Sequence, residues 1–173
     1  IDGATDYPVA LGRQTYQDSI FRSWAAGNIT ADPTNPGHLA LVFSDMRNSP
    51  APAADLNPYE STTNSDLIVS ESTDYGQHWS SPVAVNLAGD QFQSWAAFDG
   101  AGTLRIGTFD RSTDPANHKY DYSLVTQTGP STFSRSVVST VQSDPTQGDR
   151  WFAGTLDPDF PFATSFLGDY SGI

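Results

Sequence analysis

Cysteine is absent from the 173 residues, and residues of positive charge are scarce. Without cysteine the chain has no disulfide, no thiolate nucleophile and no thiolate ligand for a metal. Its 8 Lys and Arg residues stand against 20 Asp and Glu residues, which gives a formal net charge of −12 at pH 7. Because such a surface repels phosphates and anionic lipids, we expect neither nucleic acid nor membrane as a partner.

Long apolar runs and helical periodicity are missing as well. No run is long enough to cross a membrane, and no stretch keeps the helical spacing of apolar residues over three turns. No signal peptide is recognisable and the chain begins at Ile1 without Met, so we expect a mature or excised piece of a longer protein. Only 16% of the residues are charged, whereas there are 14 Gly and 12 Pro. This composition predicts an all-β fold of short strands joined by turns.

One stretch of sequence recurs along the chain. FRSWAA at residues 21–26 returns as FQSWAA at 92–97, and a weaker third copy, RWFA, stands at 150–153. After each copy comes a turn containing glycine and then an apolar segment that ends in an acidic residue. These segments, which we predict to be strands, are residues 39–45, 104–110 and 163–169. Such self-similarity at long spacing indicates a repeat architecture.

Two further strands complete each of the first two units. Residues 66–70 and 120–125 alternate as half-buried strands do, and after a turn the last strands are expected at 83–85 and 137–139. Four short antiparallel strands in a repeated unit are what a β-propeller blade requires.

We therefore predict that residues 1–173 form a partial β-propeller. Its expected parts are the outer strand of a preceding blade, two whole blades and the first half of another, at residues 1–20, 21–90, 91–142 and 143–173. Because a propeller ring needs about four to eight blades, this chain is not expected to close a ring alone. We expect the remaining blades in the parent chain, and self-association of copies is the alternative.

Residues 72–79, STDYGQHW, fit the pattern S-x-D-x-G-x-x-W, which is called the Asp box. The pattern predicts a tight turn between the third and fourth strands. In it Asp74 accepts hydrogen bonds from turn amides, Gly76 supplies a positive φ, Ser72 bonds locally and Trp79 packs into the blade. The matching positions of the second unit are degenerate: Thr126, Thr128, Pro130 and Phe133.

With this box inside a blade repeat, the chain resembles the Asp-box (BNR-repeat) sialidase-like β-propeller family. The closing FLGDYSGI and the segment Phe109-Asp110-Arg111 are similar to short sequence segments in secreted bacterial members. The resemblance implies a six-bladed propeller, an extracellular location and a carbohydrate or glycoconjugate partner. Family members include exo-sialidases, other glycoside hydrolases and propellers with no known reaction. In these proteins the Asp box is a folding device, not an active-site element.

Candidate site residues gather on the propeller face that carries the loops between the second and third strands and between blades. The arginines expected to bind a substrate carboxylate there are Arg22, Arg47, Arg111 and Arg150. The candidates for a catalytic role are Asp45, Asp110 and Tyr170. Because an Asp ends the second strand of every unit, interblade salt bridges and turn locks are the competing interpretation.

The catalytic set of the sialidases does not carry over to this sequence. A sialidase needs three arginines, a Tyr nucleophile paired with Glu, and an Asp acid/base. The F/Y-R-I-P motif near the first family arginine is missing, since Phe21-Arg22-Ser23-Trp24 departs from it after two positions. The chain has two glutamates: Glu71 adjoins the Asp box on the opposite face, and Glu60 has no motif around it.

Metal chemistry has little support in the sequence. His38, His78 and His118 are far apart without metal-ligand spacing, so we expect no transition-metal site. Asp110, Asp114 and Asn117 offer oxygen ligands in one loop, which suits Ca²⁺, the one cofactor that the sequence suggests. The same residue types are also ordinary turn formers.

Three functions remain open at this point. The first is a sialidase-like glycan-active propeller, a glycoside hydrolase. The second is a non-catalytic propeller module that binds carbohydrate or protein, and the third is a stability module without a ligand. Exposed aromatics beside unpaired arginines on the loop face would favour the first two, and a face sealed by Asp–Arg pairs would favour the third.

Overall fold

The computed structural model describes residues 14–16, 19–23, 27–48 and 64–144. Over these residues the chain is all-β, and no helix occurs among them, as the sequence predicts. The strands are β1 Gln14–Tyr16, β2 Ser19–Ser23, β3 Gly27–Ala31, β4 Leu39–Asp45, β5 Asp66–Ser72, β6 Val83–Ala84, β7 Gln91–Phe98, β8 Leu104–Asp110, β9 Asp121–Gly129 and β10 Thr132–Val137.

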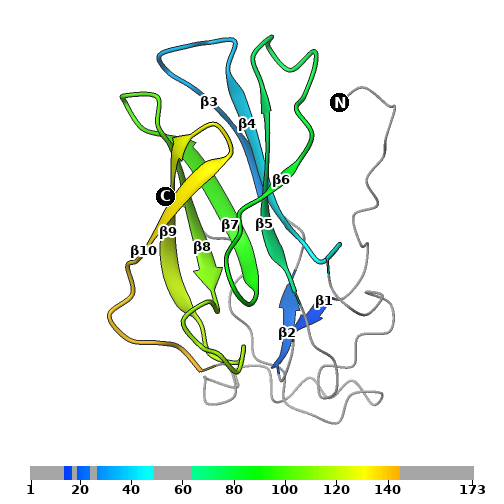
Figure 1. The fold of residues 1–173 in the computed structure, drawn as a ribbon, viewed down its shortest axis with the longest axis vertical. Coiled ribbons are helices and arrows are strands. Elements are labelled where there is room, and N and C mark those ends of the chain that lie inside the picture. Colours follow the sequence, from blue (N-terminus) through cyan, green and yellow to red (C-terminus); the bar gives the residue numbers. More distant parts are fainter. Residues whose placement is uncertain (1–13, 17–18, 24–26, 49–63, 145–173) are drawn as a thin grey trace.

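The strands form two four-stranded antiparallel sheets (Figure 1). The first sheet has the order β3-β4-β5-β6 and the second has the order β7-β8-β9-β10, so each strand pairs with its neighbour in the sequence. This confirms the predicted four-stranded antiparallel units, which fall within residues 21–90 and 91–142. β1 and β2 pair separately as a two-stranded sheet.

Most predicted strands occur where the sequence places them, but the last strand of the second unit does not. β4 and β8 match the predicted strands residue for residue, whereas β10 begins at Thr132, well before the predicted strand at 137–139. Gly129 lies opposite Thr132, so two residues, Pro130 and Ser131, make the turn. Ser131 adopts φ 55°, the left-handed conformation that such a short hairpin connection needs. The degenerate Asp box is therefore a tight hairpin.

The repeated hexamer does not occupy the same place in both units. In the second unit residues 92–97 lie within β7, the first strand of the second sheet. In the first unit residues 21–23 end β2, and β3 opens the first sheet after them. Ala31 pairs with Leu39 as Phe98 pairs with Leu104, which sets the true structural correspondence. The third copy of the hexamer and the predicted strand at 163–169 lie outside the described residues.

The main core lies between the two sheets. One face of each sheet contributes side chains that are at most 2% exposed. They form a single cluster: Ala40, Val42, Leu67, Val69 and Val85 from the first sheet and its edge, and Ala96, Leu104, Ile106 and Val125 from the second. Because alternate residues of a strand point to opposite faces, this shared apolar layer fixes the register of both sheets.

Polar side chains tie the sheets together around this layer. The Asn28 side chain on β3 donates from Nδ2 to the Ala96 carbonyl at 2.7 Å, and its Oδ1 accepts from the Ala96 N–H at 2.7 Å. It thus pairs with the backbone of β7 as a neighbouring strand would. Within the interior, the Ser94 hydroxyl lies 2.9 Å from both the Ser44 and Thr108 hydroxyls. The interface is therefore specified by hydrogen bonds as well as by apolar contact.

Replacing Asn28 with Ala is expected to lower the free energy of unfolding. The change leaves the N–H and C=O of Ala96 without their partner, and an unpaired buried group costs about 1–3 kcal/mol. Denaturant unfolding followed by tryptophan fluorescence measures the loss. Asn86→Ala, at an exposed position after β6, is the control and should change stability little. Equal stability of the two variants would contradict the role given to Asn28.

Candidate functional site

β4 and β8 end, and β5, β7 and β9 begin, at one end of the sheets, which we call the loop end, and the hairpin turns lie at the opposite turn end (Figure 1). Each sheet brings a pair of aspartates face to face at the loop end. Asp45 is the register partner of Asp66, and Asp110 is the register partner of Asp121. The same arrangement in both sheets makes the loop end the candidate functional site.

In the first sheet, Asp45 is held by Arg47. Its carboxylate accepts from the Arg47 backbone N–H at 2.7 Å and from Nε at 2.9 Å, and it also forms an ion pair with Nη2. The Asp45 side chain is only 2% exposed. Both guanidinium contacts are to Asp45 Oδ2, and Oδ1 accepts from the backbone, so Arg47 is already engaged by its own loop.

Asp66 lies beside this pair and is 6% exposed. Burial raises its pKa, and the nearby charges of Asp90 and Asp45 add to the shift. A hydrogen bond from Asn48 Nδ2 at 2.8 Å and the charge of Arg47 act in the opposite direction. A buried carboxyl with a raised pKa can retain a proton that exposed acids lose.

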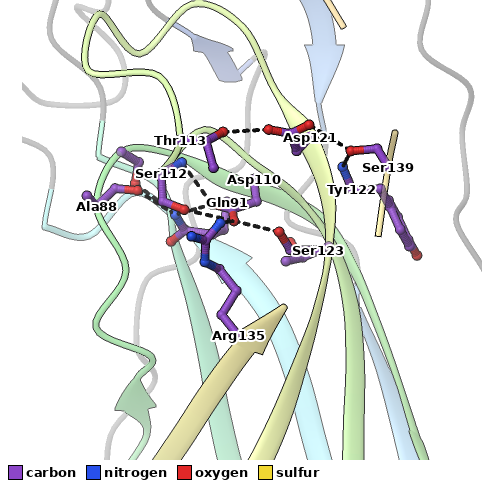
Figure 2. A network of polar contacts seen from close by, with 12 residues as sticks. Ala88, Gln91, Asp110, Ser112, Thr113, Asp121, Tyr122, Ser123, Arg135 and Ser139 are labelled. Carbon is purple, nitrogen blue, oxygen red and sulfur yellow. Dashed lines mark hydrogen bonds and ion pairs between the residues drawn. The ribbon is translucent and has the colours of Figure 1, made fainter. Parts of the chain in front are cut away.

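In the second sheet, Asp110 is fully buried and accepts hydrogen bonds from several directions (Figure 2). Oδ2 accepts from Ser123 Oγ at 2.7 Å, Ser112 Oγ at 2.8 Å and Arg135 Nη1 at 2.9 Å. Oδ1 accepts from the Ser112 N–H at 2.9 Å and, more weakly, from Gln91 Nε2 at 3.4 Å. The carboxylate is therefore surrounded by donors and has no open side for a substrate.

Asp121, the first residue of β9, extends these polar contacts at the loop end of the second sheet (Figure 2). It accepts from Thr113 Oγ1 at 2.5 Å and from Ser139 Oγ at 2.7 Å. Burial, the largest single influence, acts to raise the pKa of Asp121, but the hydrogen bonds from Thr113, Ser139 and Gln142 outweigh it and lower the pKa. Asp121 is thus ionised and fastened to the β8–β9 connection and to the segment after β10.

Between the sheets, Arg111 and Asp90 form an ion pair in which both side chains are 0% exposed. Arg111 Nη1 lies 3.2 Å from Asp90 Oδ2, and the same oxygen accepts from Asn117 Nδ2 at 2.8 Å. Asp90 Oδ1 accepts from the Ser65 N–H at 2.8 Å. This ion pair joins the β6–β7 connection, which contains Asp90, to the β8–β9 connection, which contains Arg111.

Only some of the site residues predicted from the sequence lie at the loop end. Asp45, Asp110, Arg47 and Arg111 all reach the loop end, but each is engaged in an ion pair. Arg22 lies on β2, away from the two four-stranded sheets in the strand order. Arg150 and Tyr170 lie outside the described residues.

Sequence reasoning missed five residues of this end: Asp66, Asp90, Gln91, Asp121 and Arg135. Asp66 and Asp121 both begin a third strand, so the repeat carried a signal that could have found that pair. Arg135 gave no such signal, because its carboxylate partner is 25 residues away and is chosen by the pairing of β8, β9 and β10.

The Asp box at the turn end has the geometry that the sequence predicts. Asp74 Oδ1 accepts from the His78 N–H at 2.9 Å, and Ser72 Oγ accepts from the Gly76 N–H at 2.9 Å. Gly76 adopts φ 84°, and Trp79 Nε1 donates to its carbonyl at 3.1 Å. All of these bonds close the turn on itself, so the box stabilises the connection between β5 and β6.

The side-chain oxygens proposed as Ca²⁺ ligands accept hydrogen bonds from protein groups. Asp114 accepts from the backbone N–H groups of Ala116, His118 and Lys119, and Asn117 Oδ1 accepts from the Asp90 N–H. Asp110 is engaged as described above. Within residues 27–48 and 64–144, no three His, Asp or Glu side chains are arranged to hold a metal ion. Binding of Ca²⁺ stays a prediction of the sequence to which this geometry adds no support.

Comparison with models of known protein families gives no match for this chain, and comparison with curated proteins gives none either. The resemblance to the Asp-box family therefore depends on the motif and on the two sheets. No helix able to cross a membrane occurs in the part of the chain that the structure describes.

Replacing Arg111 with Met is expected to destabilise the protein strongly. Removing one partner of a buried ion pair leaves an uncompensated charge on Asp90, which costs about 3–5 kcal/mol. Arg105→Met is the matched control, because Arg105 and Asp99 form an ion pair in which the side chains are 38% and 33% exposed. Exposed pairs contribute little, so chemical denaturation should separate the two variants. A comparable loss in both would argue against a buried, structural role for Arg111.

The Asp box should contribute stability that depends on pH. The backbone N–H of His78, followed by its side chain and Ser72, lowers the pKa of Asp74 from 3.8 to about 2. Because the folded pKa is the lower one, the contribution is present above 3.8 and is lost as the pH falls through about 2. Asp74→Ala should therefore lower the denaturation midpoint near neutral pH, with a difference from wild type that shrinks toward about pH 2.

Gln77→Ala, in the same turn but exposed, is the control for Asp74→Ala and should follow the wild type at every pH. A difference between wild type and Asp74→Ala that stays constant with pH would contradict the ionised, hydrogen-bonded role of Asp74.

Proposed function

We propose that this chain supplies two blades of an extracellular, sialidase-like Asp-box β-propeller, and that this propeller is a non-catalytic module that binds carbohydrate. Two consecutive four-stranded antiparallel sheets that share a core support the blade assignment. The closed Asp-box turn between β5 and β6 supports the family assignment. The two sheets do not form a closed ring, so the remaining blades are proposed to be the structural partner.

The observation that carries the non-catalytic assignment is the mutual pairing of charges at the loop end. Hydrolysis of a glycoside needs a carboxyl group that can reach the scissile bond, and recognition of sialic acid needs guanidinium groups facing its carboxylate. Each of the arginines 47, 111 and 135 is in an ion pair with an aspartate at this end. Asp45 and Asp110, the acids that the repeat singles out, are 1% and 0% exposed.

The chemistry left at the surface of this end suits a neutral glycan. Asn48, Asn86 and Thr113 are exposed there. Asn48 and Thr113 each donate one hydrogen bond to an aspartate of this end, so their remaining hydrogen-bonding groups are the ones that can meet a ligand. Amides and hydroxyls both donate and accept hydrogen bonds, as sugar hydroxyls require. The net charge of −12 also repels anionic ligands. We therefore propose neutral carbohydrate in preference to sialylated glycans.

A glycoside hydrolase is the second candidate, and one observation favours it. Burial and neighbouring carboxylates raise the pKa of Asp66, while Asp45, directly across the sheet, is paired with Arg47. Two carboxyl groups whose surroundings differ in this way are the pattern of an acid/base pair. Asp66 would then be the proton donor.

A glycan panel combined with a turnover assay separates these candidates. The chain is applied to immobilised neutral and sialylated oligosaccharides and is incubated with fluorogenic neutral glycosides and a fluorogenic sialoside. We expect saturable binding to neutral members, little binding to sialylated ones, and no turnover above the blank. Circular dichroism of the same sample verifies that the chain is folded.

The variants Asp66→Asn and Asp99→Asn test whether any turnover depends on Asp66. Turnover that is lost in Asp66→Asn but kept in Asp99→Asn, whose carboxylate lies at the turn end, would replace the binding proposal with the hydrolase. A folded chain that retains no glycan of any kind would overturn carbohydrate binding and leave the stability module.

A further inference from the structure

His38 occupies an unusual position at the turn end, between two carboxylates. It lies in the turn from β3 to β4, and its ring contacts Phe98 on β7 with centroids 4.9 Å apart. Nδ1 lies 3.1 Å from Asp32 Oδ2, and Nε2 lies 3.0 Å from Glu71 Oε1. Ionised carboxylates only accept hydrogen bonds. Both ring nitrogens can therefore be satisfied together only when both carry a proton, that is, when His38 is an imidazolium.

The two carboxylates connect His38 to the second sheet. Glu71 uses its other oxygen, Oε2, to accept from Gln127 Nε2 on β9 at 3.0 Å. Asp32 Oδ1 accepts from the Thr34 N–H at 2.8 Å and from Thr34 Oγ1 at 2.7 Å. Gly102, in the turn from β7 to β8, packs so closely that a Cβ there would lie 2.9 Å from Asp32 Oδ1. The imidazole thus sits where the turns of both sheets meet.

We propose that His38 acts as a proton-operated clasp between the two sheets: the imidazolium links Asp32 to Glu71, and through Glu71 to Gln127, and loss of one proton opens the clasp. A neutral imidazole keeps a single N–H. One of its nitrogens then presents a lone pair to a carboxylate oxygen, so one hydrogen bond is replaced by repulsion. One link in the chain of hydrogen bonds that runs from Asp32 through His38 and Glu71 to β9 is lost in consequence.

The charges around His38 support a protonated ring. From its own turn it faces Asp32 and from β5 it faces Glu71, whereas β7 and β9 present the uncharged Phe98 and Gln127. The nearest charges of the other turns pair among themselves: Asp99 with Arg105, and Asp74 with His78 in the Asp-box turn, which docks on Gly37. No positive group among the described residues competes with His38 for its two carboxylates.

The pKa values agree with this geometry. Burial, the largest single influence, acts to lower the pKa of His38, but the hydrogen bonds and charges of Asp32 and Glu71 outweigh it and raise the pKa above 6.5. The hydrogen bonds from Thr34 and His38 hold the pKa of Asp32 at about 2.

The direction of the pH effect follows by linkage. The stabilisation by His38 is fully present below 6.5, the pKa of the unfolded chain, and is lost as the pH rises through the higher folded value. The contribution of Asp32 is present above 3.8 and is lost toward about pH 2. The stabilisation by these two groups is therefore greatest between pH 3.8 and pH 6.5 and declines above pH 6.5, and the clasp itself opens as the pH rises through the folded pKa of His38.

Two measurements on the whole chain test the clasp. In the first, denaturant unfolding is recorded from about pH 5.5 to about pH 8.5 for the wild type, His38→Gln and His78→Gln. The folding constant of the wild type should fall with rising pH by about tenfold for each unit by which the folded pKa exceeds 6.5. His38→Gln should lose this component, whereas His78→Gln, which changes an exposed histidine outside the sheet interface, should keep it.

In the second measurement, the ring protons of the three histidines are titrated by NMR in the native protein, with His78→Gln and His118→Gln used to assign His38 by elimination. A His38 midpoint above 6.5 supports the clasp, and this result does not require His38→Gln to fold. A midpoint at or below 6.5, or an identical pH dependence of stability in His38→Gln and the wild type, would overturn it.

Discussion

Each of the two sheets has one face of aliphatic side chains that water cannot solvate favourably, and the rest of the structure depends on how that face is covered. The sheets cover one another: Val42 and Val69 of the first and Ile106 and Val125 of the second belong to one buried cluster. Burial of apolar area supplies the main driving force for this contact. It has no direction of its own, so it does not by itself set how one sheet is placed against the other.

Polar contacts at three places along the interface set how one sheet is placed against the other. Asn28 on β3 pairs with the backbone of Ala96 on β7. At the loop end Asp90 and Arg111 join the last connection of the first sheet to the loop after β8. At the turn end Glu71 links His38 to Gln127. Since an unpaired buried polar group is costly, a sheet that slid by one residue would break these ties as well as expose apolar surface.

The small number of basic residues limits the chemistry that the loop end can perform. A protein with 8 basic and 20 acidic residues has few guanidinium groups to distribute. In the part that the structure describes, arginines 47, 111 and 135 neutralise buried aspartates at this end. Arginines committed in this way hold the loops in place instead of facing a ligand. Asp45 and Asp110 are therefore best explained as parts of the scaffold.

Much of the fold could be predicted from the sequence, because local signals were strong. β4 and β8 were found residue for residue, since each is an apolar run that ends in Asp after a turn. The start of β10 was missed because the second unit lacks the Asp and Gly of the box, and a shorter hairpin through Pro130 and Ser131 replaces it. The repeated hexamer also misled the alignment of the first unit, because residues 21–23 lie on β2, which pairs with β1, whereas residues 92–97 lie on β7, which pairs with β8.

The candidate site was predicted less completely than the fold. The structural interpretation of Asp45 and Asp110 followed from their recurrence, but the partners of Asp110 did not. Arg135 meets Asp110 only because β10 pairs with β9 and β9 with β8. Such tertiary pairing leaves no pattern in the neighbouring sequence.

The central claim is that the shared core and its polar ties make the two sheets one cooperative unit. Native-state hydrogen exchange under increasing denaturant tests it most directly, by comparing amides of β4 and β5 with amides of β8 and β9. We expect the slowest amides of both sheets to converge on one opening free energy with the same dependence on denaturant. Two separate openings, with one sheet exchanging fully while the other stays protected, would contradict it.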